Sequence, residues 1–441
     1  MGILHKLGEI VDDAKSEYAK NVKIDFEEVL IRGNCDKETS IIGLSGYDEF
    51  ISYLLREGYR EKVQFVYIDP PFFTKAKYAA NFKLKDSRGQ SKKIDMLAYD
   101  DRWGRNVETY IKDMTKGLLM IRDLLKDEGV IAIHLDKHAS HYARLILDEV
   151  FGEKNFINEI IWQYKSGGTN KNSFASKHDN ILVYGKTKKH KFNVIKEKSY
   201  NRRMQQYGFK NVEEFKDEIG WYTMVNAKDV WQINMVGRTS SERTGYATQK
   251  PQALTNRLIK AFTDEGDIVA DFFSGSGTTL GSALNLNRLC FCCDVNPMAI
   301  SFNLSKTVGS DMPFKFVKNC KENYEVGDLK VYKDICEEGD IISLSSYEPV
   351  LDQSKFTSEN YDFIKNMAKD NPEKLINFVS FDFDYDGVVH REDFSMKKIK
   401  EEILDCVKFS KQYGGKSNSK IHILAMDIFG GFSKTELVEK R

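Results

Sequence analysis

Two hydrogen-bond acceptors and an aromatic ring follow an apolar run near residue 66. The run Val66-Tyr67-Ile68 is typical of a strand buried on both faces. Pro70 and Pro71 end it, because proline cannot donate a hydrogen bond to a sheet. At the strand exit, the Asp69 carboxylate and the Pro70 carbonyl can accept the two hydrogens of an exocyclic NH2 group, and Phe72 can stack on the ring that carries it. The alternative interpretation is an ordinary strand exit with an incidental aspartate.

A glycine-rich turn between two later apolar runs is the second chemical motif. Residues 268–294 predict a strand, a turn with Gly275 and Gly277, a helix and a second strand. The second strand ends at Asp294, an acid placed to bind ribose hydroxyls. The glycine spacing does not match the dinucleotide fingerprint, and Asp271 precedes the turn. This acid favours a cationic ligand such as S-adenosylmethionine, which has an amino group, a sulfonium and a ribose but no phosphate.

The two motifs together resemble the amino-methyltransferases of DNA, a family of N6-adenine and N4-cytosine enzymes. The resemblance rests on Asp-Pro-Pro-Phe at 69–72 and Asp-Phe-Phe-Ser-Gly-Ser-Gly-Thr-Thr at 271–279. Thr-Gln-Lys-Pro at 248–251 and Asp-Asn-Ile-Leu-Val-Tyr-Gly-Lys at 179–186 are also similar to segments of this family. The catalytic motif precedes the cofactor motif, which is the order of the permuted β class and is similar to type II and type III modification methyltransferases.

The resemblance implies a site-specific DNA methyltransferase that uses S-adenosylmethionine. It implies extrusion of the target base from double-stranded DNA and direct methyl transfer, with N6 of adenine favoured because Asp precedes Pro-Pro. The implied catalytic residues are Asp69, Pro70, Pro71 and Phe72. The implied cofactor-binding residues are Asp271, Phe272, Phe273, Ser274, Gly275, Gly277, Thr278, Asp294 and Lys250.

Other activities fit the same motifs. N4 of cytosine or an amine of RNA presents the same two hydrogens, so the chemistry alone does not choose among them. A catalytically inactive DNA-binding relative would keep the fold, but the intact Asp69, Phe72, Gly275 and Gly277 argue against it. C5 methylation of cytosine through a cysteine nucleophile is disfavoured, because the chain contains no Pro-Cys pair.

Apolar strands and amphipathic helices alternate up to residue 184, which predicts an α/β fold with a parallel sheet. Strands 157–164 and 180–184 lack an intervening helix and predict an antiparallel hairpin at the sheet edge. The resemblance implies a Rossmann-like methyltransferase fold with a mixed seven-stranded sheet. Strands that end in Asp69 and Asp271 are expected to be neighbours at the carboxyl edge of this sheet. His134 is interpreted as a core histidine.

Two polar regions interrupt this pattern. Residues 73–104 contain many lysines and few core positions, so we expect a mobile loop beside the site. Residues 186–243 form an inserted segment that is basic at first and then rich in aromatic residues, and we interpret it as the target-recognition segment. The expected nucleic-acid-binding residues are Lys186, Lys188, Lys189, Lys191, Arg202 and Arg203.

The sequence divides into four regions. Residues 1–185 are the catalytic half with an N-terminal helix, 186–243 the recognition segment, 244–310 the cofactor-binding half and 311–441 a small C-terminal α+β module for protein contacts. Asp382-Phe383-Asp384-Tyr385-Asp386-Gly387 is similar to a calcium loop, but the run before it alternates like a strand. We therefore predict a strand that ends in an Asp-Gly turn, and no metal site.

Composition constrains the partners and the compartment. The chain has 441 residues, 41% of them hydrophobic and 30% charged, with zero net charge, and it contains no apolar run of membrane-spanning length. Three of the seven cysteines, Cys290, Cys292 and Cys293, lie inside an apolar, strand-like run, which favours reduced, buried thiols in the cytoplasm. The expected partners are double-stranded DNA, a restriction endonuclease subunit and a second copy of the chain.

Overall fold

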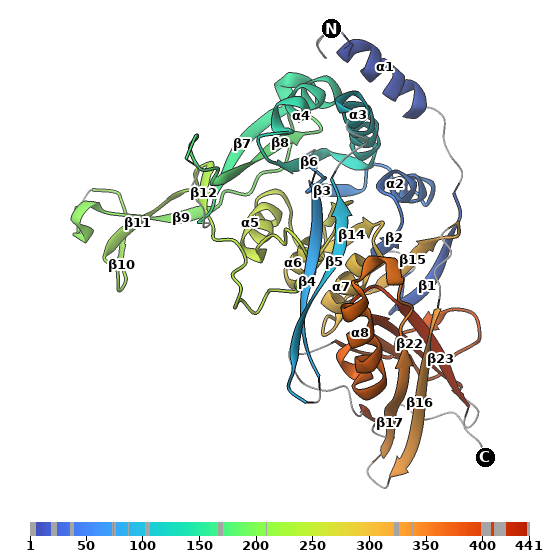
Figure 1. Cartoon of the computed structure of the whole chain (residues 1–441). Helices are drawn as coiled ribbons and strands as arrows, with labels where there is room; N and C mark the ends of the chain where they lie inside the picture. Colours follow the sequence, from blue (N-terminus) through green and yellow to red (C-terminus); the bar gives the residue numbers. More distant parts are fainter. Residues whose placement is uncertain are drawn as a thin grey trace.

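The structure is a computed structural model, in which residues 6–18, 24–35, 39–72, 74, 76–86, 88–101, 106–165, 171–208, 210–321, 326–336, 339–397, 407–409 and 420–438 are described. Within these ranges an α/β body carries a projecting small sheet on one side and a second large sheet below (Figure 1).

The main sheet is mixed, as expected, but it has eleven strands rather than seven. Its order is β12-β7-β8-β6-β3-β13-β14-β2-β15-β1-β19. Two of the four additional strands are the edge strands: β12 comes from the inserted segment and pairs with β7, and β19 comes from the C-terminal module and pairs with β1. The bounds in this order are Val230–Gln232, Phe156–Gln163, His178–Gly185, Leu125–Leu135, Val63–Ile68, Ile268–Asp271, Leu289–Asp294, Ser40–Leu44, Phe314–Asn319, Phe26–Arg32 and His390–Arg391.

Strands β3 and β13 are parallel neighbours, with Val66 opposite Ala270. They therefore bring Asp69 and Asp271 to the same edge of the sheet, although some 200 positions separate these residues in the sequence. The hairpin of β7 and β8 is antiparallel, as predicted, but β12 pairs with β7 and forms the edge of the sheet.

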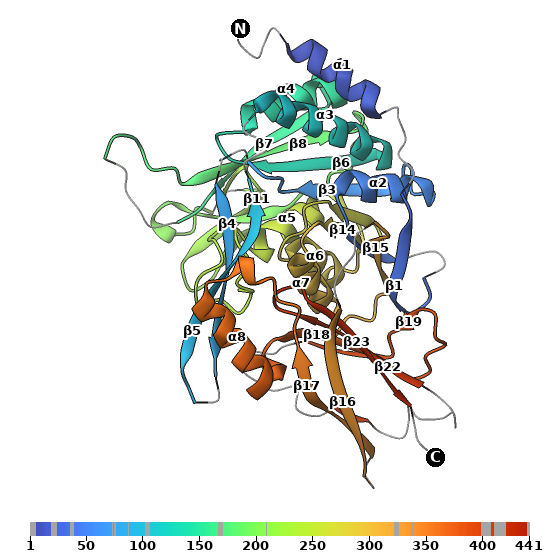
Figure 2. The same cartoon turned by 45° about the vertical axis from the view of Figure 1, so that its right-hand side comes forward.

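Helices cover both faces of the sheet, which makes three layers (Figures 1 and 2). One face shares a hydrophobic core with α2, α3 and α4, and the other with α5, α6 and α7. Helix α1 packs on the outer side of α3. The bounds of α1 to α7 are Leu7–Tyr18, Tyr47–Arg56, Val107–Leu124, Ser140–Leu147, Gln252–Phe262, Thr278–Asn285 and Pro297–Thr307.

The expectation of a mobile loop over residues 73–104 is wrong for most of that stretch. Strands β4 (Lys77–Lys85) and β5 (Ser91–Asp100) form a long antiparallel hairpin that lies beside α8 (Ser358–Asp370) in both views. Apolar residues alternate with the lysines, so one face of the hairpin is buried and the other is exposed.

The inserted segment contains a small antiparallel sheet in the order β10-β11-β9, which projects from the body (Figure 1). The bounds of β9, β10 and β11 are Lys196–Tyr200, Glu214–Lys216 and Trp221–Asn226. The chain returns through β12, which pairs in parallel with β7.

The C-terminal module is an α+β unit, as predicted. Its sheet has the order β20-β18-β22-β23-β16-β17-β21 and packs beside α8. The module lies on α7, where Asn377 Nδ2 donates to the Ser301 carbonyl (3.0 Å). The catalytic sheet reaches further than residue 310, because β15 ends at Asn319. In the above order the strand bounds are Phe394–Lys397, Ile376–Asp382, Lys420–Asp427, Phe432–Val438, Val326–Cys336, Gly339–Glu348 and Val407–Phe409.

Strand β18 ends at Asp382 and a turn follows, as predicted for the acidic loop. Its carboxylates accept hydrogen bonds from nearby backbone: Asp382 from Asp384 N and Arg391 N, and Asp386 from Val388 N. Among the described residues, no group of three or more potential ligands could hold a metal ion. In the same part of the chain, no helix is long and apolar enough to cross a membrane.

Candidate active site

A cavity of about 420 Å³ opens at the carboxyl edge of β3, β13 and β14. This volume lies within the usual range for small-molecule sites. The Asp-Pro-Pro-Phe corner, the glycine-rich turn and residues 246–250 line it together. The two motifs predicted from the sequence therefore form one site.

Asp69 has one oxygen engaged and one oxygen free. Its Oδ2 pairs with the Lys250 ammonium, whose side chain is only 9% exposed. Its Oδ1 is buried and has no hydrogen-bond partner within the described parts of the chain. A buried acceptor without a partner is costly, so this oxygen is suited to a donor that enters the cavity.

Phe72 stacks on a histidine that belongs to a buried hydrogen-bond network. Its ring is nearly parallel to the His134 imidazole, with an angle of 14° and centroids 6.0 Å apart. His134 is fully buried, with Nδ1 2.9 Å from the Tyr67 hydroxyl and Nε2 3.1 Å from Asp179 Oδ2. Burial lowers the pKa of His134, so the neutral ring accepts from Tyr67 and donates to Asp179. The interpretation of His134 as a satisfied core histidine is confirmed, and this core supports Phe72 from behind.

The glycine-rich turn adopts a conformation that requires its glycines. Gly275 has φ +44° and Gly277 has φ +73°, both in the left-handed region. A Cβ atom on Gly275 would lie 3.1 Å from the Tyr246 ring, and one on Gly277 3.1 Å from Asn303 Oδ1. The turn therefore follows the cavity wall closely and leads into α6, whose N-cap is Gly277.

Asp271 and Asp294 place two carboxylates beside this turn. Asp271 accepts from Thr279 Oγ1 (2.6 Å) and Phe273 N (3.1 Å). Asp294 accepts from Gly275 N and from Asn296 N, both at 2.9 Å. Burial raises the pKa of Asp271 to about 7 and that of Asp294 to about 6.

These residues fit S-adenosylmethionine. The two carboxylates keep unused lone pairs for an ammonium group and for ribose hydroxyls. Lys250 is engaged by Asp69 and leaves no free cation among the lining residues for a pyrophosphate. The acceptor set therefore suits a cationic nucleoside without phosphate groups.

The structure brings almost all predicted catalytic and cofactor residues to this cavity. Gly277 is the exception, since it caps α6 behind the lining. The lining also includes residues that were not predicted: Ala98 and Tyr99 from the hairpin, and residues 45–48, which follow β2. The alternation of apolar residues along β5 was an available signal for the first pair.

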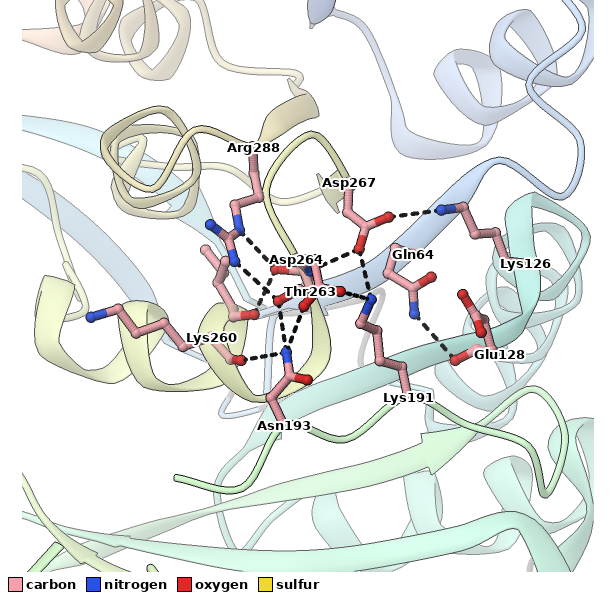
Figure 3. Close-up of polar contacts among 11 residues, drawn as sticks. Gln64, Lys126, Glu128, Lys191, Asn193, Lys260, Thr263, Asp264, Asp267 and Arg288 are labelled. Atoms are coloured by element: carbon pink, nitrogen blue, oxygen red, sulfur yellow. Dashed lines mark hydrogen bonds and ion pairs between the residues drawn. The ribbon is translucent and has the colours of Figure 1, made fainter. Parts of the chain in front are cut away.

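The basic residues at the start of the inserted segment lie elsewhere. β8 runs antiparallel to β6, with Gly185 opposite Val130, so the chain after β8 emerges at the edge opposite Asp69. Lys186 there pairs with Glu61 (2.9 Å), and Lys191 contacts Asp264 and Asp267 (Figure 3). Asn193 beside them donates to the carbonyls that end α5.

This geometry places four of the six expected nucleic-acid-binding residues away from the cavity. Lys186 and Lys191 neutralise carboxylates and anchor the inserted segment to the body. Lys188 and Lys189 are exposed but emerge at the same distant edge. Of the expected nucleic-acid-binding residues, only Arg202 and Arg203 lie in the projecting part, where both are exposed.

The fold and the site define the class of S-adenosylmethionine-dependent DNA methyltransferases. The family model described as DNA methylase, which covers N6 and N4 amino-methyltransferases, matches residues 63–304, more than half of the chain. The chain belongs to this DNA methylase family.

Individual relatives are distant. The chain is 24% identical to the type II methyltransferase M.EcaI of Enterobacter cloacae, over 64% of this chain and 76% of the relative. It is also 24% identical to the Mod subunit of the type III restriction-modification enzyme StyLTI of Salmonella typhimurium, over 62% of this chain and 55% of the relative. Among solved structures, the cytosine-N4-specific PvuII DNA methyltransferase is 14% identical, with a TM-score of 0.43 over 66% of this chain and 92% of that chain.

We expect Lys250→Met to slow methyl transfer about tenfold, because Asp69 loses the partner that orients its Oδ1. The affinity for S-adenosylmethionine should change less than threefold, since the ammonium is directed at Asp69 rather than at the cofactor side. Single-turnover rates and calorimetry measure the two quantities separately. A large loss of cofactor affinity at an unchanged rate of methyl transfer would show that Lys250 binds the cofactor rather than orienting Asp69.

Cofactor affinity should rise with pH between about 5.5 and 7.5, because a cation binds the ionised form of Asp271. The pKa of Asp271, about 7, lies above the ordinary 3.8, so its ionisation costs folding stability as the pH rises toward 7, and a bound cation offsets that cost. Calorimetry across this range is the measurement.

Asp271→Asn is the matched control, because it removes this titration but keeps the titration of the ligand. It should weaken binding at least about tenfold at pH 8 and remove the rise in affinity near pH 7, which leaves only the contribution of Asp294 near pH 6. A wild-type pH profile in this variant would exclude Asp271 as the titrating group.

Proposed function

We propose that this methyltransferase acts on N6 of adenine in double-stranded DNA at a specific sequence, with the target base extruded into the cavity. The observation that carries the proposal is the buried, unpartnered Oδ1 of Asp69 beside the Phe72 ring. An exocyclic amine supplies the missing donor, and the purine stacks on the ring.

The protein acts chiefly by positioning. S-adenosylmethionine supplies an electrophilic methyl carbon bonded to a cationic sulfur. Asp69 Oδ1 and the Pro70 carbonyl accept the two amine hydrogens and turn the nitrogen lone pair toward that carbon. As the nitrogen gains positive charge, the Asp69 carboxylate stabilises it and is placed to receive the proton that leaves.

The identity of the methylated base is the direct test. Purified protein, S-adenosylmethionine and DNA without prior methylation should yield N6-methyladenine by mass spectrometry of nucleosides. N4-methylcytosine would keep the family assignment but replace the proposed substrate, since the family covers both amines. The absence of both bases would indicate an inactive DNA-binding relative, unless RNA offered in a parallel reaction is methylated, which would identify an RNA amine as the substrate.

We further propose that the chain serves a restriction-modification system in the cytoplasm. The names of relatives support this, because they include type II methyltransferases and type III Mod subunits. The buried free thiols of Cys290, Cys292 and Cys293 fit a reducing compartment. A restriction endonuclease subunit and a second copy of the chain are the proposed protein partners, and the mass of the complex purified from its own cells distinguishes them.

A further inference from the structure

The β4–β5 hairpin presents a fixed inner face and a free outer face. The inner face consists of Ala80, Phe82, Leu84, Ile94, Met96 and Ala98, which are all buried. Phe82 packs edge-on against Phe429 of the C-terminal module (5.9 Å), and inner-face Lys92 pairs with Glu359 of α8 (2.7 Å). These contacts hold the hairpin as a rigid arm.

The outer face concentrates positive charge. Lys83 lies directly opposite Lys93 in the register, and Lys85 follows on the same face. Lys93 is 64% exposed and contacts Asp95 at 3.0 Å. In the described residues, Lys83 and Lys85 form no ion pair with a carboxylate. Like charges opposite each other destabilise a strand pair, so an external anion would relieve this face.

The hairpin begins at the catalytic cavity, because Ala98 and Tyr99 of β5 are part of the cavity lining. Lys93 lies six positions before Tyr99, which corresponds to about 20 Å at roughly 3.4 Å per residue. The same length of B-form DNA is about six base pairs at roughly 3.4 Å each. The charged part of the arm is therefore within reach of the duplex that flanks a base held in the cavity.

We propose that the outer face of the β4–β5 hairpin, with Lys83, Lys85 and Lys93, binds the phosphate backbone of the DNA duplex beside the target base. The inference rests on the proposed function and adds a contact surface outside the inserted segment. Its role is to hold the flank of the duplex, with no dependence on sequence.

The test measures the salt dependence of DNA binding in the full chain. The probe is a fluorescein-labelled duplex of about 30 base pairs, titrated between about 50 and 200 mM salt. For the double variant Lys83→Gln/Lys93→Gln, the slope of log affinity against log salt should become shallower by about 2, since each phosphate contact contributes about 0.9. The charge-preserving Lys83→Arg/Lys93→Arg variant should keep the wild-type slope.

Lys188→Gln/Lys189→Gln is the matched control, an exposed pair at the opposite edge of the sheet, and its slope should equal the wild type. The melting temperature of Lys83→Gln/Lys93→Gln should equal or exceed the wild-type value, because the opposed charges are gone and the exposed Lys93–Asp95 ion pair contributes little. The proposed DNA contact would be wrong if Lys83→Gln/Lys93→Gln kept the wild-type slope. It would also be wrong if Lys188→Gln/Lys189→Gln reduced the slope by the same amount. If the wild-type protein does not bind the duplex, the proposed function itself fails and this surface with it.

Discussion

Replacing Asp69 with alanine is expected to lower the single-turnover rate of methyl transfer by about 10²-fold or more, roughly 3 kcal/mol of transition-state stabilisation. The reason is that Asp69 Oδ1 strengthens its hydrogen bond only as the amine gains positive charge. DNA and cofactor affinities should change much less, because both ligands contact many other groups. Rapid-quench assays at saturating DNA and cofactor measure the chemical step.

Asp69→Ala also leaves the Lys250 ammonium buried without its counter-charge. An unpaired buried charge lowers the stability of the folded protein independently of any effect on catalysis. The double variant Asp69→Ala/Lys250→Met removes both charges and should recover the melting temperature while methyl transfer stays slow. This comparison separates the chemical role of Asp69 from its structural role. If Asp69→Ala kept the wild-type rate, the Asp-Pro-Pro-Phe corner would be a structural turn only.

Phe72 provides an internal contrast, because its role is stacking rather than charge stabilisation. Phe72→Ala should weaken capture of the extruded base, and tyrosine or tryptophan at this position should restore part of the loss.

The chemical motifs were predictable because each one is local. A buried strand, its proline stop and the glycine turn all lie within a few residues, so Asp69 and Asp271 could be recognised from their neighbours. Their proximity followed from the rule that ligands bind at the carboxyl edge of parallel strands, and the pairing of Val66 with Ala270 confirms it.

The hairpin was missed although its pattern was present. Apolar residues alternate with lysines through β4 and β5, which is typical of strands with one buried face. The number of lysines suggested a solvated loop. A period-2 count would have identified both strands, but not the contacts of the buried face with α8 and the C-terminal module.

The role of the basic run was not predictable from charge. Lys186 and Lys191 look like phosphate ligands in the sequence, and their partners Glu61, Asp264 and Asp267 lie over 70 positions away. Only the tertiary structure shows that these lysines are neutralised at the edge opposite the cavity.

The inserted segment is attached to the body at two points, and these points determine which residues can be exchanged to test its function. Asn193 fixes the start to the end of α5, and β12 fixes the return to β7 (Figure 3 shows the first anchor). Residues 196–226, which hold β9 to β11, lie between these anchors. They can be exchanged for the corresponding segment of a relative without removing a strand of the main sheet.

We expect exchange of residues 196–226 to redirect the methylated sequence completely, or to abolish specific methylation, because Arg202, Arg203 and exposed apolar side chains such as Tyr207 (45%) and Ile219 (61%) leave with the segment. Affinity for S-adenosylmethionine should stay within about twofold, since no cavity residue changes. Methylation-sensitive sequencing of DNA from cells that express each chimera identifies the target. A chimera that still methylates the original sequence would place recognition outside this segment, and residues 311–441 would then be the next region to exchange.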